Sequence, residues 1–343
     1  MTNRFSDKIE SNRPMMTDTL GAFFATAMSL TESRASLTSR LLRNDKADVI
    51  TNKHPGEVAT LVVPGFHANG RVIAKNMDRH LRFMGPTLFA VHPEKGFSLD
   101  STKEEWVKAI RKLGQIPLQI YAQSMGGMLA LDVLSDESVR KQLPQINVLE
   151  IDSGLSKPDD LPLGTRAAMF GTKLLPLTRL SDKLYTLAMM QETKKPIDRG
   201  DDETAEEAFE HILSSALTGY DAGKGQIGYI LETDVGDMDL SGLSEDIGRA
   251  IYISAASDNV LDIFGAASTI NNSLGGGMQH VIDSRRAPMT HAAGAEHTRG
   301  VIDNLLGRNQ EDYRVISIRD HLAKRAVRQT MASSSTTKFA KAA

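Results

Sequence analysis

Ser124 stands where a predicted strand meets a predicted helix. An apolar run over Pro117–Ala122 precedes it, and a second apolar run over Met125–Leu134 follows it. The residues two positions before and two after the serine are small, as a tight turn requires. Such a turn presents the hydroxyl at the carboxyl end of a strand, with the backbone N–H of Met125 facing the same point. This arrangement suits nucleophilic attack on a carbonyl carbon, with Met125 as a donor to the oxyanion that forms.

The residues around this serine resemble the nucleophile elbow of the α/β-hydrolase family, whose pattern is Gly-x-Ser-x-Gly. The chain reads Ala122-Gln123-Ser124-Met125-Gly126, so alanine replaces the first glycine. Alanine keeps the requirement for a small side chain at that position. The resemblance covers about residues 58–156 and 246–308. It implies a serine hydrolase that forms an acyl-serine intermediate, similar to esterases and lipases in cleaving a carboxylic ester.

A serine hydroxyl is a weak nucleophile until a base removes its proton, and the base in turn needs an orienting acid. The family places both after its last two strands, in the order serine, acid, histidine. Asp258 follows the predicted strand Ala250–Ala255, and the resemblance implies that it is the acid. Two alternatives stay open: Asp262 lies four residues further on, and Asp152 follows the predicted strand Ile146–Ile151.

Two histidines follow the last predicted strand, Gln279–Asp283, and either could be the base. We favour His291, because it lies in a loop-like stretch rich in small and turn-forming residues. His297 is the alternate, since it falls where the final helix should already have begun. His280 lies within the strand itself, which indicates a packing or surface role.

A second loop is expected beside the serine. The stretch Val63-Pro64-Gly65-Phe66-His67 resembles the loop after the family's third strand, with Pro64 in place of the usual histidine. The resemblance implies that the backbone N–H of Phe66 is the second oxyanion donor, beside that of Met125. His67 is next to this loop and is a candidate substrate contact, although a plain loop histidine is the alternative.

These residues need a scaffold in which short apolar runs alternate with amphipathic ones. The runs predict strands and helices in turn, which is typical of an α/β fold with a mostly parallel, doubly wound sheet and helices on both faces. The expected strands are Ala59–Val63, Thr87–Val91, Pro117–Ala122, Ile146–Ile151, Ala250–Ala255 and Gln279–Asp283. Helices are expected at Arg71–Phe83, Ser101–Leu113, Met125–Leu134 and Glu296–Leu306, with a capping box from Ser101 to Glu104.

The alternation stops near Ser156 and resumes after about residue 245, which predicts an α-helical cap insertion. We therefore expect four parts. Residues 1–56 are a helical N-terminal extension, 57–156 and 246–308 the core, 157–245 a helical cap or lid, and 309–343 a C-terminal helix with a basic, disordered tail. The cap would cover the site and shape the pocket for a small acyl substrate.

Composition narrows the class of protein. The chain has 343 residues, no cysteine and a formal net charge of −3, so we expect neither a disulfide framework nor a nucleic-acid partner. No metal motif or cofactor motif occurs. With no apolar stretch long enough to cross a bilayer, we expect a cytoplasmic protein. Contact with a membrane surface through residues 15–42 or the basic tail is an alternative, as is a signal peptide. The oligomeric state has no sequence signal.

Other functions use the same residues. An acyltransferase, a perhydrolase or a peptidase could employ this triad. A non-catalytic binding protein on the same fold would keep the pocket and lose the triad. Dehalogenases and epoxide hydrolases of the family are disfavoured, because they carry an aspartate where Ser124 stands. The presence of serine, aspartate and histidine in the expected order makes ester hydrolysis the leading hypothesis.

Overall fold

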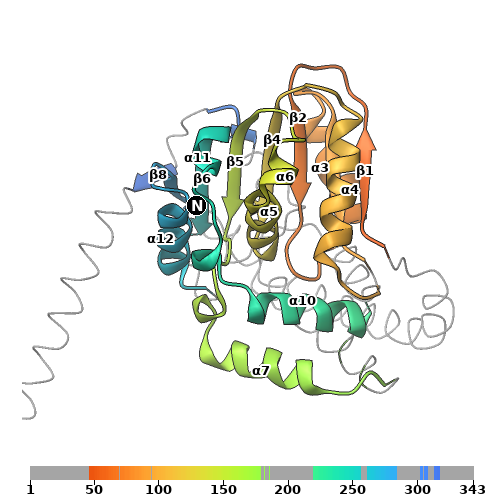
Figure 1. Cartoon of the computed structure of the whole chain (residues 1–343), viewed down its shortest axis with the longest axis vertical. Coiled ribbons are helices and arrows are strands. Elements are labelled where there is room, and N and C mark those ends of the chain that lie inside the picture. Colours follow the sequence, from red (N-terminus) through yellow and green to blue (C-terminus); the bar gives the residue numbers. More distant parts are fainter. Residues whose placement is uncertain are drawn as a thin grey trace, which may run out of the picture. The chain divides into compact units, whose positions relative to one another are not determined.

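One mixed sheet lies at the centre of the described residues (Figure 1). The computed structural model describes residues 46–68, 70–93, 95–178, 181, 185, 219–255, 261–283, 302, 303, 305–307 and 313–316. The eight strands lie in the order β1-β3-β2-β4-β5-β6-β7-β8. Their bounds are β1 Asp48–Asn52, β2 Ala59–Val63, β3 Thr87–Val91, β4 Leu118–Gln123, β5 Ile146–Asp152, β6 Ile247–Ala255, β7 Gln279–Asp283 and β8 Tyr313–Ile316.

Strands β2 to β7 pair in parallel, whereas β1 and β8 pair antiparallel with β3 and β7 at the two edges. Helices connect the parallel strands, as crossover connections require. The described helices are α3 Gly70–Leu81, α4 Leu99–Arg111, α5 Met125–Ser135, α6 Glu137–Arg140, α7 Leu163–Leu174, α10 Tyr220–Glu232, α11 Leu243–Asp246 and α12 Ile263–Ser273, with short 3₁₀ turns η1 Pro158–Asp160 and η2 Val235–Asp237. The predicted mostly parallel α/β sheet is confirmed.

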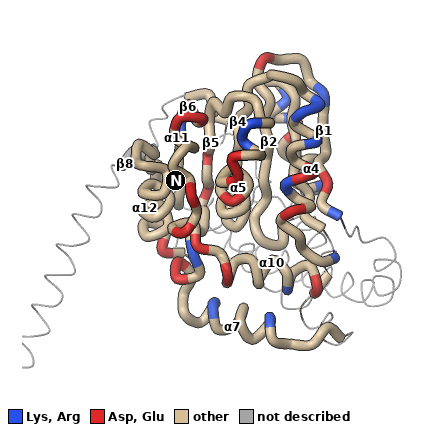
Figure 2. Tube along the Cα trace, viewed as in Figure 1, with Lys and Arg blue, Asp and Glu red and all other residues tan. Residues whose placement is uncertain are grey.

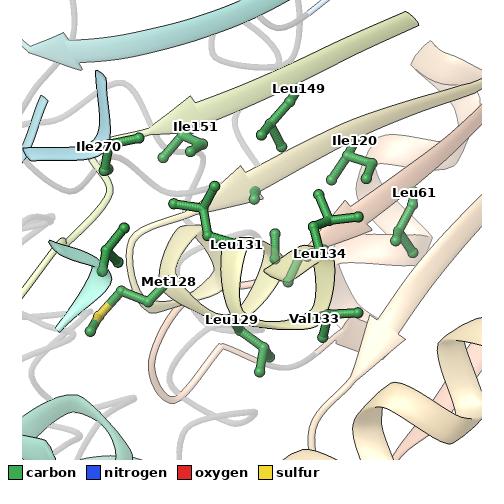
Figure 3. Packing of buried hydrophobic residues seen from close by; sticks show 14 of the residues in the cluster. Leu61, Ile120, Met128, Leu129, Leu131, Val133, Leu134, Leu149, Ile151 and Ile270 are labelled. Atoms are coloured by element: carbon green, nitrogen blue, oxygen red, sulfur yellow. The ribbon is translucent and has the colours of Figure 1, made fainter. Parts of the chain in front are cut away.

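Helices cover both faces of the sheet. One face packs against α4, α5 and α12, and α5 is so apolar that nearly all of its side chains are buried. Figure 3 shows residues of α5 gathered against Ile120, Leu149 and Ile151 of strands β4 and β5. The other face packs against α3, whose Ile73, Met77 and Leu81 are buried. Strands buried on both faces read as continuous apolar runs, which is why the sequence located them.

The two edge strands were not predicted. β1 lies within the range expected to be a helical extension, residues 1–56, and β8 lies within the range expected to be a C-terminal helix and tail, residues 309–343. Their sequences, DVITN and YRVI, are short and mix polar with apolar residues. An edge strand pairs on one side only, so it needs no continuous apolar run. The predicted N-terminal helix over residues 15–42 lies outside the described residues.

One predicted helix start is wrong. The capping box was expected at Ser101, but α4 begins at Leu99 and its N-cap is Ser98. The Ser98 hydroxyl accepts a hydrogen bond from the Ser101 N–H at 3.2 Å. Ser98 is therefore the capping residue, and Ser101 supplies the N–H that it caps. Both serines fit the sequence signature of a cap, and the extended backbone of Ser98 (φ −138°, ψ 119°) decides between them.

The region between β5 and β6 was expected to be the cap. It contains α7 and α10, whereas residues 179–218 of this region, apart from 181 and 185, lie outside the described residues. In Figure 1, α10 runs across the ends of the central strands and α7 lies beyond it. Acidic and basic residues are interspersed along the described chain (Figure 2). None of the helices that the structure describes is both long enough and apolar enough to cross a membrane.

Candidate active site

Ser124 lies at the junction of β4 and α5, as the sequence predicts. Its backbone has φ 52° and ψ −121°, a conformation that costs a non-glycine residue about 1–3 kcal/mol. The surrounding structure holds it there: the Ser124 N–H donates to the carbonyl of Asp152 at 2.9 Å, and the Ser124 carbonyl accepts from Gly127 at 2.9 Å. Although Ser124 is the N-cap residue of α5, its hydroxyl makes no cap hydrogen bond. The hydroxyl is therefore not used to stabilise the helix.

Small residues are required around this turn. A Cβ on Gly126 would lie 2.5 Å from the carbonyl oxygen of Val63 and 2.6 Å from that of Pro64, which are rigid backbone atoms. Ala122 is fully buried in β4, so a methyl group is accommodated where the α/β-hydrolase pattern has its first glycine. The structure thus explains why the second glycine is present and why alanine suffices for the first.

The loop after β2 lies directly against the turn. A Cβ on Gly65 would lie 3.0 Å from the Cβ of Ser124 and 3.1 Å from the carbonyl oxygen of Gln123. This close approach places the backbone of Gly65 and Phe66 beside the serine. Met125 is the first residue of α5, and the first N–H groups of a helix have no partner within it. The two predicted oxyanion donors therefore come from adjacent segments.

Backbone strain is concentrated at this edge of the sheet. Among the described residues, three that are not glycine have positive φ: His67 at 62°, Ser124 at 52° and Ser153 at 46°. They follow β2, β4 and β5, which are parallel and end at the same edge. Strained residues cluster at functional sites because such sites fix side chains in directions that ordinary backbone does not allow.

Two hydrogen bonds that could not be foreseen from the sequence hold the loop after β2. Nε2 of the buried His92 lies 3.0 Å from the carbonyl oxygen of Pro64. The backbone N–H of His67 donates to Oε1 of Gln226, on α10, at 3.0 Å. Burial lowers the pKa of His92, so the neutral ring donates an N–H to the carbonyl. One feature of the sequence could have identified His92 as a residue of the site: it directly follows β3, at the edge where all the parallel strands end.

His67 is buried and neutral. Burial lowers the pKa of His67 from 6.5 to about 3. Its ring lies 5.2 Å from that of Tyr185, centroid to centroid. Within the described part of the chain, neither ring nitrogen has a hydrogen-bond partner. The structure therefore places His67, the candidate substrate contact, in the loop beside Ser124. It lies next to Tyr185 and Gln226, which belong to the segment between β5 and β6.

The acid candidates differ in their surroundings. Asp152 ends β5 and is 1% exposed, and its carboxylate accepts hydrogen bonds from the Tyr121 hydroxyl at 3.0 Å and the Ser153 hydroxyl at 3.3 Å. Asp262 is the N-cap of α12, and its carboxylate accepts from the Gly265 N–H at 3.1 Å. Each of these two carboxylates thus has a visible structural role.

The favoured acid and both candidate bases, Asp258, His291 and His297, lie outside the described residues. The strands before them are described. β6 ends at Ala255 and β7 ends at Asp283, and these two residues are paired in register. The chain therefore leaves both strands at the same edge as Ser124. His280, within β7, is buried, and its Nε2 lies 2.9 Å from the Ser254 hydroxyl, so it packs inside the fold as expected.

Helix α10 contacts the loop after β2 and also α5. Gln226 accepts the hydrogen bond from the His67 N–H, and the Tyr229 hydroxyl donates to Oδ2 of Asp132, on α5, at 3.2 Å. Helix α7 packs on α10 in turn, because the Tyr220 hydroxyl donates to the carbonyl oxygens of Thr172 at 2.6 Å and Leu175 at 3.0 Å. The two helices thus form a layer that begins at the loop beside Ser124.

A histidine that is neutral in the fold makes stability depend on pH. Unfolded His67 takes up a proton below about pH 6.5, whereas folded His67 does so only near pH 3, so stability should fall as the pH is lowered between these values. The slope from one such group is about 1.4 kcal/mol per pH unit. Urea unfolding between pH 7.5 and pH 5 should therefore show a smaller loss for His67→Asn than for the wild type. Asparagine tolerates the positive φ. Equal slopes would contradict a neutral His67.

The comparisons with known proteins bear on the fold. No model of a known protein family matches the sequence, and no curated protein matches it. Solved structures do match. A thermophilic esterase from Thermogutta terrifontis is 15% identical with a TM-score of 0.56, covering 78% of this chain and 99% of that one.

Two further structures give the same result. A bromoperoxidase from Bacillus anthracis is 14% identical with a TM-score of 0.58, covering 76% of this chain and 95% of that one. A hydrolase from Oleispira antarctica is 12% identical with a TM-score of 0.57, covering 77% and 96%. At these identities the similarity concerns the arrangement of strands and helices, and it includes nearly the whole of each solved chain.

Proposed function

Because the chain has the α/β-hydrolase fold, we propose that it is a serine hydrolase that cleaves a carboxylic ester through an acyl-serine intermediate. The observation that carries this proposal is Ser124 itself. It lies at the end of a central strand in a strained conformation, with a hydroxyl that caps no helix. When a residue is held in a strained conformation and its side chain stabilises no helix, a chemical role for that side chain is favoured.

The reaction uses three side chains in the proposed scheme. His291 takes the proton from the Ser124 hydroxyl as its oxygen bonds to the carbonyl carbon, and Asp258 orients the imidazole and stabilises its charged form. The carbonyl π electrons move onto the oxygen. When the carbonyl re-forms, the bond to the alcohol breaks and His291 gives the proton to the departing alcohol. Water then attacks the acyl-serine in the same manner and releases the acid and Ser124.

The oxyanion is held by the N–H groups of Phe66 and Met125. Support for Phe66 is the close approach of its loop to Ser124 and the anchoring of that loop by His92 and Gln226. Support for Met125 is its place at the start of α5, where the N–H groups point away from the helix and the helix dipole favours negative charge. Anchored donors stabilise the transition state well because they need no reorganisation.

Residues 157–245 form the lid over the site in this proposal. Its support is that α10 contacts the loop beside Ser124 and that α7 packs against α10. A lid of this kind excludes water and defines the acyl pocket.

The acid can be identified by substitution. Asp258→Asn is expected to lower kcat roughly 10⁴-fold, because asparagine leaves the histidine in the wrong tautomer. Asp262→Asn is the matched control, since an asparagine still caps α12, and it should retain activity within a few fold. Steady-state kinetics on a nitrophenyl ester measure both. If Asp152→Asn causes the large loss and Asp258→Asn does not, the acid follows β5 instead of β6.

The reaction class is tested with the wild-type protein. A panel of nitrophenyl esters of increasing acyl length, with lactones and aminoacyl amides beside them, should show turnover that is highest for one group of esters. Hydrolysis confined to amides would make the protein a peptidase or amidase. Folded protein that turns over none of the panel, and that no fluorophosphonate labels, would instead support a binding protein on this fold.

A further inference from the structure

Among the described residues, three buried polar atoms beside the proposed site have no hydrogen-bond partner. They are Nδ1 and Nε2 of His67 and the hydroxyl oxygen of Tyr185. His67 is 4% exposed and Tyr185 6%, and their ring centroids are 5.2 Å apart. Leaving such a group buried and unpaired costs about 1–3 kcal/mol, so each case calls for an explanation.

Neighbouring groups of the same kinds are satisfied. The Tyr220 ring lies 5.4 Å from that of Tyr185, yet its hydroxyl donates to the carbonyls of Thr172 and Leu175. The buried His92 has the carbonyl of Pro64. The fold thus provides partners for aromatic polar groups nearby, and the pair His67 and Tyr185 is the exception.

The end of the Tyr185 ring lies against Gly223, in α10. A Cβ on Gly223 would lie 1.9 Å from the Tyr185 hydroxyl oxygen and 2.3 Å from ring carbon Cζ. The glycine therefore leaves space for the ring and its hydroxyl together. A phenylalanine would fill an apolar position here without leaving a buried hydroxyl unpaired, so the hydroxyl is not explained by packing.

The location connects these atoms to the chemistry. His67 follows Phe66, the proposed oxyanion donor, and a Cβ on Gly65 would lie 3.0 Å from that of Ser124. The backbone N–H of His67 is occupied by Gln226, which fixes the residue while its ring nitrogens remain unpaired. A substrate bound at Ser124 therefore lies close to His67 and Tyr185.

We infer that His67 and Tyr185 bind an uncharged hydrogen-bonding group of the substrate, such as a hydroxyl, near the scissile ester. This inference rests on the proposed function and adds a substrate class to it. A neutral imidazole offers one donor and one acceptor, and a phenol offers both. A substrate hydroxyl, which also donates and accepts, complements the pair.

A charged group does not fit. Burial lowers the pKa of His67 to about 3, and burial also raises the pKa of Tyr185. Among the described residues, the one ionisable side chain that adds to either shift is Tyr220, which also raises the pKa of Tyr185, and no cationic side chain contributes. A substrate carboxylate would therefore be desolvated without a counter-ion, which is costly. The pair should select hydroxylated esters over carboxylated ones.

The test compares matched substrates on matched variants. Two substrate series are used: nitrophenyl esters of straight-chain acids, and acetate esters of straight-chain alcohols. Each member of a series carries a hydroxyl, a methyl or a carboxylate on one carbon of the chain, and that position moves along the chain from one member to the next. The wild type should prefer the hydroxyl over the methyl in kcat/KM by about tenfold or more at one carbon in one series, and should disfavour the carboxylate. Tyr185→Phe should reduce this hydroxyl-to-methyl ratio about tenfold.

Tyr220→Phe is the control, because its hydroxyl bonds to the protein. It should keep the wild-type ratio and lower the melting temperature, whereas Tyr185→Phe, which loses only an unpaired hydroxyl, should not lower it. If labelling by a fluorophosphonate shows an active serine but no series shows a hydroxyl preference, or Tyr185→Phe keeps that preference, the inference is wrong and the proposed function stands. Absence of labelling would count against the proposed function itself.

Discussion

Replacing Ser124 by alanine is expected to lower kcat for ester hydrolysis roughly 10⁴- to 10⁶-fold. The loss is large because alanine has no oxygen with which to form the acyl intermediate, so the other groups can act only on water. Steady-state kinetics on the best ester of the panel measure the effect. KM should change little, since the hydroxyl contributes to the transition state and not to substrate binding.

The alanine variant should fold. The Ser124 hydroxyl makes no cap hydrogen bond, and the main-chain bonds to Asp152 and Gly127 do not depend on the side chain. Ser135→Ala, at the other end of α5, is the matched control: it removes a hydroxyl that donates to the Asp132 carbonyl and should leave kcat within a few fold. Turnover of the Ser124 variant above about 1% of the wild type would show that another residue is the nucleophile.

Replacing His291 by glutamine is expected to have an effect of similar size. Without a base, the Ser124 hydroxyl keeps its proton, and removal of the base alone costs about as much as removal of the whole triad in a related mechanism. The wild-type rate should rise with pH as the histidine loses its proton, and this dependence should be absent from the residual rate of the variant. Kinetics over a range of pH measure both.

His297→Gln is the control for this experiment. It should keep kcat within a few fold, because His297 falls in the stretch expected to be the final helix. The opposite result, in which His297→Gln loses turnover and His291→Gln retains it, would move the base to His297. Comparable losses in both variants with intact folding would mean that neither assignment is complete.

The central strands and the serine turn could be predicted because local sequence determines them. β2, β3 and β7 have the predicted bounds, and β4 and β5 differ only at their ends. Strands buried on both faces must be apolar throughout, and a serine between such a strand and an apolar helix leaves few alternatives. The edge strands could not be predicted, since a strand paired on one side carries no such constraint.

Contacts between distant segments were also beyond the sequence. Nothing in the residues around His67 indicates that its N–H would meet Gln226, 159 positions away, or that Tyr185 would lie over its ring. Likewise, Asp262 was an alternative acid in the sequence, and the hydrogen bond that its carboxylate accepts from the Gly265 N–H shows that it caps α12. Such choices depend on how elements pack, which no local pattern encodes.

Whether Ser124 is an activated nucleophile can be tested by mass spectrometry. The intact wild-type protein is reacted with a fluorophosphonate, and peptide mapping then locates the adduct. A serine activated by a base displaces fluoride from phosphorus, whereas an ordinary serine does not. We expect one adduct per chain, on the peptide that contains Ser124, and none on the folded Ser124→Ala variant. An adduct on a different residue, or no adduct on folded wild-type protein, would contradict this expectation.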